Sequence, residues 1–400
     1  MDRFGDKICC NPTVKLKKQE SYPVIDIDKI TPGYKAVRSV ASIEYTGQGG
    51  AKFQDHDVLF ARITPCLENG KMAIADTEGQ NGIGSTELFV FRGIDGVSDT
   101  DYVYYLLCMK HIRQLAANSM TGASGRQRAD LDFIKRIQWD FPDIEMQKKI
   151  ASVLSAYDNL IEVNNKRIKV LEQIAENLYK EWFVRFRFPG HETAEFENGI
   201  PEGWAYRRAD EIIDFNPTLK TGNQTEFTII PMEALSTNSM VLDSGCFVRQ
   251  DSISGRRSQN GDTLLAKITP CLENGKTGFV MGMPENEVLG GSTEFVVMRS
   301  KALTPHYVYC IARSYYFRQT AILSMNGADG RQRVDEDKLK STKILQPEKT
   351  VLDHFETIVT PIFDGVYQMV QENKNLIQQR DLLLPRLMSG KLEVQYALND

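Results

Sequence analysis

A nine-residue segment occurs twice in this chain without a single difference. Ile63-Thr64-Pro65-Cys66-Leu67-Glu68-Asn69-Gly70-Lys71 returns 205 residues later (268 − 63) as Ile268-Thr269-Pro270-Cys271-Leu272-Glu273-Asn274-Gly275-Lys276. The same offset relates Asn11-Pro12 to Asn216-Pro217, Tyr102-Val103-Tyr104 to Tyr307-Val308-Tyr309, Gly125-Arg126-Gln127-Arg128 to Gly330-Arg331-Gln332-Arg333, and Pro142 to Pro347. Only Gly84-Ser85-Thr86-Glu87 drifts, returning from Gly291 after 207 residues. Solenoid units are about 20–50 residues long, so the pattern predicts a duplicated domain that recognises something with two parts.

The composition bounds the class of protein. A chain of 400 residues has room for two or three domains, and 42% hydrophobic residues suffice for their cores. No apolar run approaches the roughly 18 residues of a membrane span, and the N-terminus does not resemble a signal peptide. Seven cysteines, an odd number without a Cys-x-x-Cys pair, favour a reduced cytoplasmic setting. The net charge of −5 argues against a general nucleic-acid coat, so any DNA-binding surface must be a local basic stripe.

Each copy has the same expected layout, which indicates an α+β fold. Apolar runs typical of strands occupy 58–63, 72–75 and 88–91 in the first copy and 263–268, 278–281 and 295–298 in the second. A helical stretch follows at 101–117 or 305–323, then a glycine-containing loop at 121–128 or 326–333, and a last strand before Pro142 or Pro347. The expected domains are residues 1–142 and 189–347, with helical regions at 143–188 and 348–394.

The two helical regions carry an apolar seam of the kind that coiled coils bury. The seam residues are Ile150, Leu154, Tyr157, Ile161, Asn164, Ile168, Leu171 and Leu178 in the first region, and Phe355, Ile358, Val366, Val370, Asn373 and Ile377 in the second. We expect the two helices to pair with each other, antiparallel, with Pro361 and Pro385 kinking or interrupting the second. The alternative is two unrelated amphipathic helices, each lying on its own domain. The polar residues Asn164 and Asn373 either meet across the seam or are solvated.

No catalytic or metal-binding constellation is evident. The five histidines lack the spacing of metal ligands, and none is paired by the repeat. Gly275-Lys276-Thr277 imitates the end of a phosphate-binding loop, but Pro270 replaces its first glycine. Asn11-Pro12-Thr13 and Asn216-Pro217-Thr218 lack the aromatic residue that would stack on a flipped base, so we interpret them as turns. We therefore expect neither catalysis nor a bound metal in this chain.

Polar and basic residues recur at the expected loop tips. Arginine and lysine suit phosphates and guanine edges, whereas asparagine suits adenine edges. A single surface arginine usually has no specific role, so the recurrence is what makes the set a candidate DNA interface. The set comprises Arg62, Asn69, Lys71, Arg126 and Arg128, and their counterparts Lys267, Asn274, Lys276, Arg331 and Arg333.

Several of these motifs resemble those of the specificity subunits of type I restriction-modification enzymes. Residues 59–71 with 84–87, and 264–276 with 291–294, resemble a motif common in that family's target recognition domains. Pro142 with the following Gln147-Lys148-Lys149-Ile150-Ala151 resembles the start of its central helical region, and residues 179–183 and 383–390 resemble the ends of its two helical regions. The resemblance covers essentially the whole chain. The second region lacks the glutamine found at Gln147, which bears only on the detail of one subunit contact.

The resemblance implies both a fold and partners. It implies two tandem mixed α/β target recognition domains in a pseudo-two-fold arrangement, separated by two long helices that form an antiparallel coiled coil. Each domain would read one half of a bipartite site in double-stranded DNA, and the helices would set the gap and recruit two methylation subunits. Two restriction subunits would join them. S-adenosylmethionine, ATP and Mg would be used by the partner subunits, and this chain would hold no cofactor.

Alternatives remain open at this stage. One is the specificity subunit of a related system that cleaves on both sides of its site; others are a self-contained nuclease or methyltransferase, and a coiled-coil scaffold whose globular ends bind protein. If the two half-sites differ, base-reading residues should lie where the copies disagree, at 31–57 and 235–262, although ordinary loop drift would look the same. Candidates there are Lys35, Arg38, Lys52, Arg256 and Arg257, together with Gln48, Gln54, Arg249, Gln250 and Gln259.

Overall fold

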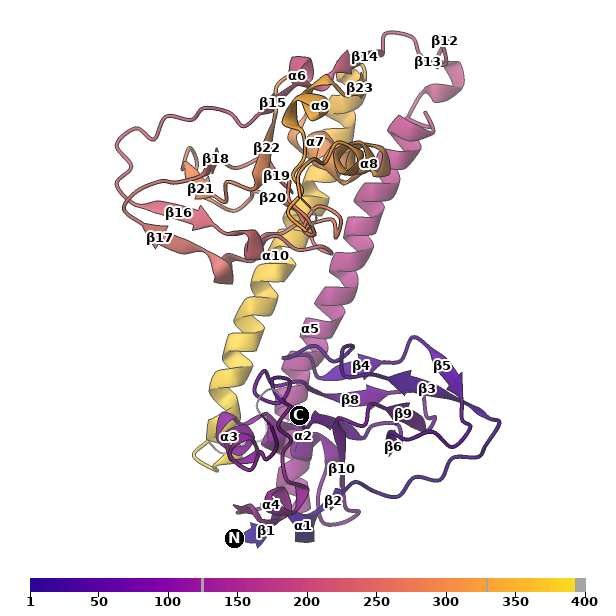
Figure 1. Cartoon of the computed structure of the whole chain (residues 1–400), viewed down its shortest axis with the longest axis vertical. Coiled ribbons are helices and arrows are strands. Elements are labelled where there is room, and N and C mark those ends of the chain that lie inside the picture. Colours follow the sequence, from indigo (N-terminus) through magenta and orange to yellow (C-terminus); the bar gives the residue numbers. More distant parts are fainter. Residues whose placement is uncertain (124–125, 329, 393–400) are drawn as a thin grey trace, which may run out of the picture. The chain divides into compact units, whose positions relative to one another are not determined.

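The computed structural model describes residues 1–123, 126–328 and 330–392; Gly125 of the repeated Gly-Arg-Gln-Arg motif lies outside them. The chain divides into two compact units (Figure 1). The first unit comprises Met1–Val163 and Asn373–Asp400, and the second comprises Asn164–Glu372. Each unit therefore combines one copy of the repeat with part of each long helix.

The first unit is built on two mixed sheets. One sheet has the strand order β2-β10-β7-β8-β4, and the other has the order β5-β3-β9-β6. The pairing of β1 with β11 joins the first and last strands of the copy. The strands are β1 (Asp2–Arg3), β2 (Ile8–Cys10), β3 (Ser21–Ile25), β4 (Ala36–Arg38), β5 (Ser42–Glu44), β6 (Ala51–Phe53), β7 (Val58–Ala61), β8 (Met72–Asp76), β9 (Gly82–Gly84), β10 (Leu88–Gly93) and β11 (Gln138–Trp139).

The second unit repeats this order, except that an isolated bridge between Val241 and Phe279 takes the place of the strand β4. Its main sheets are β15-β22-β19-β20 and β17-β16-β21-β18, and β14 pairs with β23 as β1 does with β11. A separate hairpin, β12-β13, precedes them. The strands are β12 (Phe196–Glu197), β13 (Ile200–Pro201), β14 (Ala205–Arg208), β15 (Ile213–Phe215), β16 (Phe227–Ile230), β17 (Val248–Gln250), β18 (Arg256–Ser258), β19 (Thr263–Ala266), β20 (Thr277–Phe279), β21 (Leu289–Gly291), β22 (Phe295–Ser300) and β23 (Lys343–Gln346).

The helical stretch expected in each copy is present and consists of two consecutive helices. Extended backbone at Met109 and Ser314 divides each pair. The reason is burial: the first helix of each pair lies inside the core, whereas the second buries only two residues and covers the surface. Short capped helices that the sequence analysis did not predict follow each loop. The helices are α1 (Phe4–Lys7), α2 (Thr100–Cys108), α3 (Lys110–Asn118), α4 (Leu131–Arg136), α6 (Ala209–Ile212), α7 (Pro305–Arg313), α8 (Tyr315–Leu323) and α9 (Glu336–Ser341).

The Asn-Pro pairs are turns, as expected from the sequence. Asn11 and Asn216 both have positive φ, 49° and 52°, a conformation that asparagine tolerates better than most residues. The side-chain oxygen of Asn11 accepts from the Val90 N–H at 2.8 Å, and that of Asn216 accepts from the Val297 N–H at 3.0 Å. Each asparagine therefore bonds to the neighbouring strand at the point where the first strand of the main sheet ends.

Two long helices complete the fold: α5 (Ile144–Tyr179), followed by a π-helical turn at Lys180–Val184, and α10 (Lys349–Met388). Pro361 and Pro385 do not interrupt α10, which corrects one half of that expectation; a kink at either proline stays a prediction. Both prolines are exposed on the helix, where neighbouring groups and solvent can satisfy the carbonyl that each leaves unpaired. No helix within the described residues is long and apolar enough to cross a membrane.

Within each unit the helices run antiparallel, as the seam predicted. In the second unit, Asn164 of α5 donates to Glu372 at 2.9 Å, while the Trp182 ring, beyond α5, packs against the Phe355 ring with 5.9 Å between ring centres. In the first unit, Asp158 of α5 pairs with Arg380 of α10. Eight seam residues are buried: Ile150, Leu154, Ile161, Asn164, Ile168, Phe355, Val366 and Asn373. Six are half-buried: Tyr157, Leu171, Leu178, Ile358, Val370 and Ile377. Burial of both asparagines argues against their solvation; whether they meet stays a prediction.

Candidate nucleic-acid interface

The repeated nine-residue segment forms the same tight loop in both units. Its central leucines, Leu67 and Leu272, are buried. Its glycines, Gly70 and Gly275, have φ of 74° and 82°, a region that side chains with a Cβ rarely adopt. The backbone conformation and the buried leucine together account for much of the identity between the copies.

The lysine that ends this loop is used inside each unit. Lys71 Nζ donates to the Ile27 carbonyl at 2.9 Å, and Lys276 Nζ donates to the Met232 carbonyl at 3.1 Å. Ile27 and Met232 follow β3 and β16 in the chain. Both lysines thus fasten the segment after that strand to the repeated loop, a contact that favours a fold-building role over phosphate binding.

In each unit, one ion pair joins the repeated Gly-Ser-Thr-Glu motif to the Gly-Arg-Gln-Arg motif: the first supplies the glutamate and the second supplies the arginine. Arg128 makes two parallel hydrogen bonds to Glu87, with Nε 2.8 Å from Oε2 and Nη2 2.5 Å from Oε1. Arg333 and Glu294 repeat the arrangement at 2.9 and 2.7 Å. The hydrogen bond from Arg128 lowers the pKa of Glu87. This bidentate geometry occupies both arginines within the protein.

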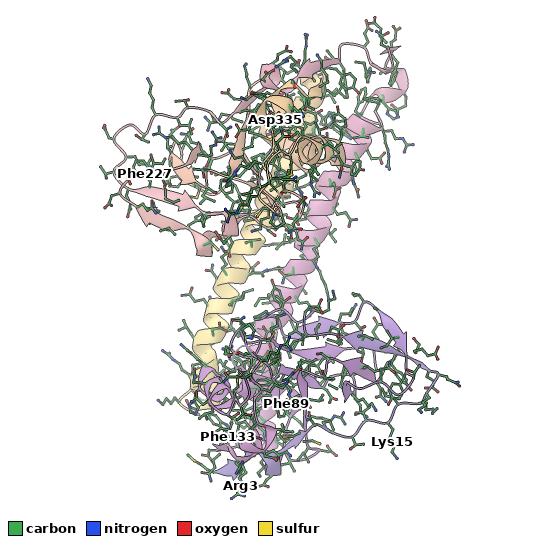
Figure 2. The ribbon with its side chains drawn as sticks, in the orientation of Figure 1. Arg3, Lys15, Phe89, Phe133, Phe227 and Asp335 are labelled. Carbon is green, nitrogen blue, oxygen red and sulfur yellow. The ribbon has the colours of Figure 1, made fainter. Side chains whose placement is uncertain are left out.

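The basic residue before the repeated loop has a different environment in each copy. The Arg62 guanidinium lies 4.9 Å from the centre of the Phe89 ring, within range of a cation–π contact; Phe89 is labelled in Figure 2. Lys267, its counterpart, contacts Glu336 at 2.9 Å. A repeated positive charge is therefore kept while its neighbours change.

Besides Arg333, which is exposed but paired with Glu294, four repeated candidates are exposed at loop tips: Asn69, Asn274, Arg126 and Arg331. They lie on adjoining loops, because the Thr64 N–H donates to the Gln127 carbonyl at 3.0 Å and the equivalent bond joins the loops of the second unit. Each unit therefore presents an exposed amide and an exposed guanidinium from two connected loops. Such groups can bind a base edge and a phosphate.

The divergent-segment candidates of the first unit differ in accessibility. Lys35 is largely buried, 2.6 Å from Asp101. Arg38 is exposed and pairs with Asp76 at 2.8 Å. Lys52 donates to the Tyr45 hydroxyl at 2.6 Å. Of these three, Arg38 is the one most available to a ligand.

In the second unit, the divergent arginines at 256 and 257 are engaged with the protein. Arg256 pairs with Glu336 at 2.7 Å, and Arg257 donates to the Leu219 carbonyl. Arg249 is exposed, with Glu287 at 3.4 Å. Arg249 is thus accessible in the way that Arg38 is. Arg256 and Arg257, like Lys35, are held by contacts within the protein.

The sequence analysis missed a repeated ion pair in each core. Arg92 binds Asp57 through two hydrogen bonds of 2.6 and 2.7 Å, and Arg299 binds Asp262 at 2.7 and 2.8 Å. Both aspartates are 1% exposed. The repeat carried the signal, because Asp57 and Asp262 are 205 residues apart while Arg92 and Arg299 are 207 apart, the two offsets already found in the motifs.

The arrangement is suited to binding. Within residues 1–123, 126–328 and 330–392, no group of three or more histidine, cysteine, aspartate or glutamate residues could hold a metal ion. What the two units present outward is a pair of similar loop surfaces with divergent segments beside them. This is the chemistry of recognition through surface contacts.

Comparisons with known proteins point the same way. A family model described as the type I restriction modification DNA specificity domain matches residues 8–173. The chain is 25% identical over 319 residues to the type I restriction enzyme MjaIX specificity subunit of Methanocaldococcus jannaschii, covering 76% of this chain and 72% of the relative. It is 23% identical over 419 residues to the MjaVIII specificity subunit of the same organism, covering 98% and 92%. The crystal structure of a type I restriction-modification system S subunit from M. genitalium has the same fold, with a TM-score of 0.54, 14% identity and coverage of 96% and 94%.

Proposed function

The chain belongs to the family of type I restriction-modification specificity subunits, and we propose that each of its two recognition domains reads one half of a bipartite DNA site. The domains proposed for this task are residues 1–142 and 189–347, with residues 143–188 and 348–394 as the regions that bind other subunits. The subunit is a non-catalytic, DNA-recognising member of its complex.

The observation that carries the proposal is a shared scaffold with divergent surroundings. Glu87–Arg128 and Glu294–Arg333 hold the same loops in both units. Arg126 and Arg331 remain exposed on those loops, where they can neutralise phosphate whatever the sequence. Readout of bases then falls to the divergent segments 31–57 and 235–262, in which Arg38 and Arg249 are the accessible arginines. Shared phosphate-binding loops combined with different base-reading segments suit a site whose two halves differ in sequence.

Methylation and restriction subunits are the partners of such a chain. We propose two of each, with the methylation subunits bound to the helical regions. S-adenosylmethionine, ATP and Mg would belong to those partners. The matched relatives are named type I restriction enzymes, which does not favour the alternative of a system that cleaves on both sides of its site.

The test is to express the chain with its methylation subunit in a host that lacks adenine methylation and to map N6-methyladenine across the genome. We expect one motif made of two halves with a constant number of unspecified bases between them. Replacing residues 31–57 by those of another family member should change one half alone. A single uninterrupted motif would contradict reading by two domains, and absence of methylation together with absence of a gel shift would contradict DNA reading altogether.

A further inference from the structure

The first unit joins its recognition domain to the long helices through buried charges. Asp158 of α5 accepts hydrogen bonds from the Tyr105 hydroxyl and from Arg380 of α10, each at 2.5 Å. Asp158 and Arg380 are 6% and 8% exposed. Arg380 also donates to the Gly33 carbonyl at 3.1 Å. One guanidinium thus connects both helices with the backbone of the recognition domain.

A second ion pair supports the same place. Lys35 Nζ lies 2.6 Å from Asp101 and donates to Ser155 of α5 at 2.7 Å. His56 contacts Asp101 from the other side at 3.3 Å. Burial alone would raise the pKa of Asp101, but the hydrogen bond from His56 and the charge of Lys35 hold that pKa at about 2. Asp101 therefore remains ionised between Lys35 and His56.

The equivalent place in the second unit has no counterpart of the Asp158–Arg380 pair. Its polar contacts to the helices are fewer: His306 contacts Glu356 of α10 at 2.8 Å, and the Met240 N–H donates to Glu172 of α5 at 2.7 Å. The backbone equivalence is direct, because the Ile74 N–H donates to the Lys35 carbonyl at 2.7 Å and the Phe279 N–H donates to the Met240 carbonyl at 2.9 Å. At the offset of 205 residues, Lys35, Asp101, Tyr105, Asp158 and Arg380 correspond to Met240, His306, Cys310, Phe363 and Ala175.

Phe363 occupies the centre of this second junction. It is fully buried, and its ring lies 4.3 Å from His306, 5.3 Å from Phe279 and 5.4 Å from Tyr309. Aromatic packing, which depends on shape and close contact, therefore replaces the central Asp158–Arg380 pair in the second unit and acts beside its two polar contacts. The first depends on the geometry of hydrogen bonds.

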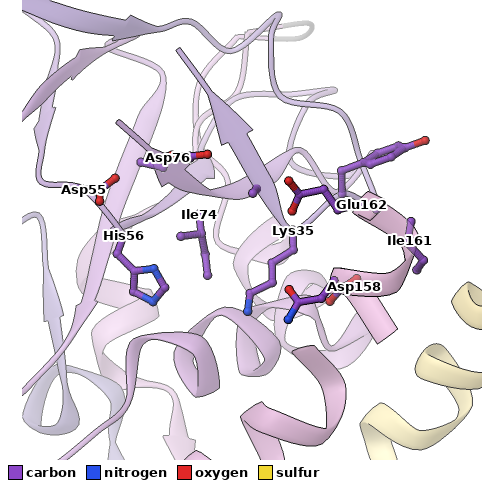
Figure 3. Close-up of a pocket in the computed structure, with 13 residues that line it drawn as sticks. Lys35, Asp55, His56, Ile74, Asp76, Asp158, Ile161 and Glu162 are labelled. Atoms are coloured by element: carbon purple, nitrogen blue, oxygen red, sulfur yellow. The ribbon is translucent and has the colours of Figure 1, made fainter. Parts of the chain in front are cut away.

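A cavity beside the charged junction strengthens this contrast. It has a volume of about 260 Å³ and is lined by Gly33, Tyr34, Lys35 and Ala36 on one side and by Asp158 and Ile161 of α5 on another (Figure 3). Gly33, Tyr34 and Ala36 are exposed, so few protein atoms pack against this segment on the side of the cavity. Arg380 and Lys35 hold the segment 33–36 from the side of the helices, and the pairing of β4 with β8 holds it from the side of the sheet.

This segment begins the divergent stretch 31–57, to which the proposed function assigns base reading. Resting on that function, we propose that the Asp158–Arg380 and Lys35–Asp101 pairs position residues 31–57 and thereby set the sequence preference of the first recognition domain alone. Phe363 serves the second domain in the same way. These are positioning residues, since they act on DNA through the segment that they hold.

The test uses the full chain in complex with its methylation subunit. Arg380→Met and Lys35→Met remove the polar contacts of these two side chains. Methionine is already present at Met240, the counterpart of Lys35 in the other copy. Phe363→Leu is the matched control in the second unit. Methylation would be measured on DNA libraries in which each base of the two half-sites is varied in turn.

We expect Arg380→Met and Lys35→Met to lower the ratio of matched to mismatched methylation by about tenfold in one half-site. The other half-site should stay within about twofold, and Phe363→Leu should relax that other half instead. Arg380→Lys, which keeps the charge, should restore part of the discrimination. Because the two sets of variants must relax opposite halves, the half-sites need not be assigned beforehand.

A merely structural role would lower methylation of both half-sites in parallel, without changing either ratio. That result, or unchanged ratios in every variant, would overturn the inference. Should Arg380→Met not fold, Lys35→Met and Asp158→Asn decide between the same outcomes. Failure of the wild-type complex to methylate any bipartite site would instead refute the proposed function on which the inference rests.

Discussion

The exposed arginines of the two glycine-containing loops offer the sharpest test of phosphate binding. Arg126 and Arg331 are equivalent by the repeat and exposed. Each phosphate contact that is lost makes the slope of log K against log salt shallower by about 0.9. Alanine at both positions should therefore reduce the slope by about 1.8, whichever sequence is bound.

The size of this effect is measurable. Raising KCl fourfold, from about 50 to 200 mM, weakens binding by about 3.5-fold per contact, so the double variant should lose about 12-fold of the salt sensitivity of the wild type. Fluorescence anisotropy with the complete site and with unrelated duplex would provide both slopes. Lys7→Ala is the control for charge, since Lys7 lies on α1 and contacts Asp2 at 3.7 Å. An unchanged slope combined with an altered sequence preference would refute the assignment.

Three further predictions concern the scaffold. Asp57→Ala should cost about 3 kcal/mol of unfolding free energy, at the lower end for a broken buried pair because Arg92 is 27% exposed; urea unfolding that matches wild type would contradict this. The hydrogen bond to Asp101 raises the pKa of His56, so its stabilisation is present below the ordinary histidine pKa of about 6.5 and is lost as pH rises through the raised value. The melting temperature should accordingly fall less with rising pH in His56→Ala than in wild type. Deleting one heptad from both α5 and α10 shortens each helix by about 10 Å, and we expect a changed gap with unchanged half-sites; methylation mapping that finds an altered half-site would count against the helices as a spacer.

The repeat made the strand framework predictable. β7, β8 and β10 and their counterparts were expected within a few residues, because their apolar runs are short and end at glycine or polar residues. The long helices were equally legible from their seam. The breaks at Met109 and Ser314 were missed because neither residue is a strong helix breaker, although the Ser314 side chain caps α8 by accepting from the Phe317 N–H. The chain turns so that one helix enters the core while the next covers it, and that is a tertiary requirement.

The candidate site was only partly predictable, because a repeat shows that two residues have the same role but does not show what that role is. Lys71, Arg128 and their counterparts recur since they hold loops together through carbonyl and carboxylate contacts. Arg126 and Arg331 recur too, yet remain exposed. No sequence pattern separates these two classes, because both consist of a cation near a glycine. The presence of an acidic partner decides whether such an arginine is used within the protein. That partner is distant in sequence, since Glu87 is 41 residues from Arg128 along the chain.

The residues that differ between the two copies also fall into two classes. Among residues where the two copies differ, Arg38 is exposed beside Asp76, whereas Lys35 is committed to Asp101 inside the unit. Both satisfy the criterion that base readers should differ between the halves. Lys35 differs from Met240 because the junctions differ in chemistry, and a residue that holds a reading segment must change whenever the support beneath that segment changes. Copy-to-copy differences in such proteins therefore comprise two sets, the residues that touch DNA and the residues that adapt one scaffold to two readers. Burial distinguishes them, since a side chain enclosed by its own protein cannot also reach a base edge.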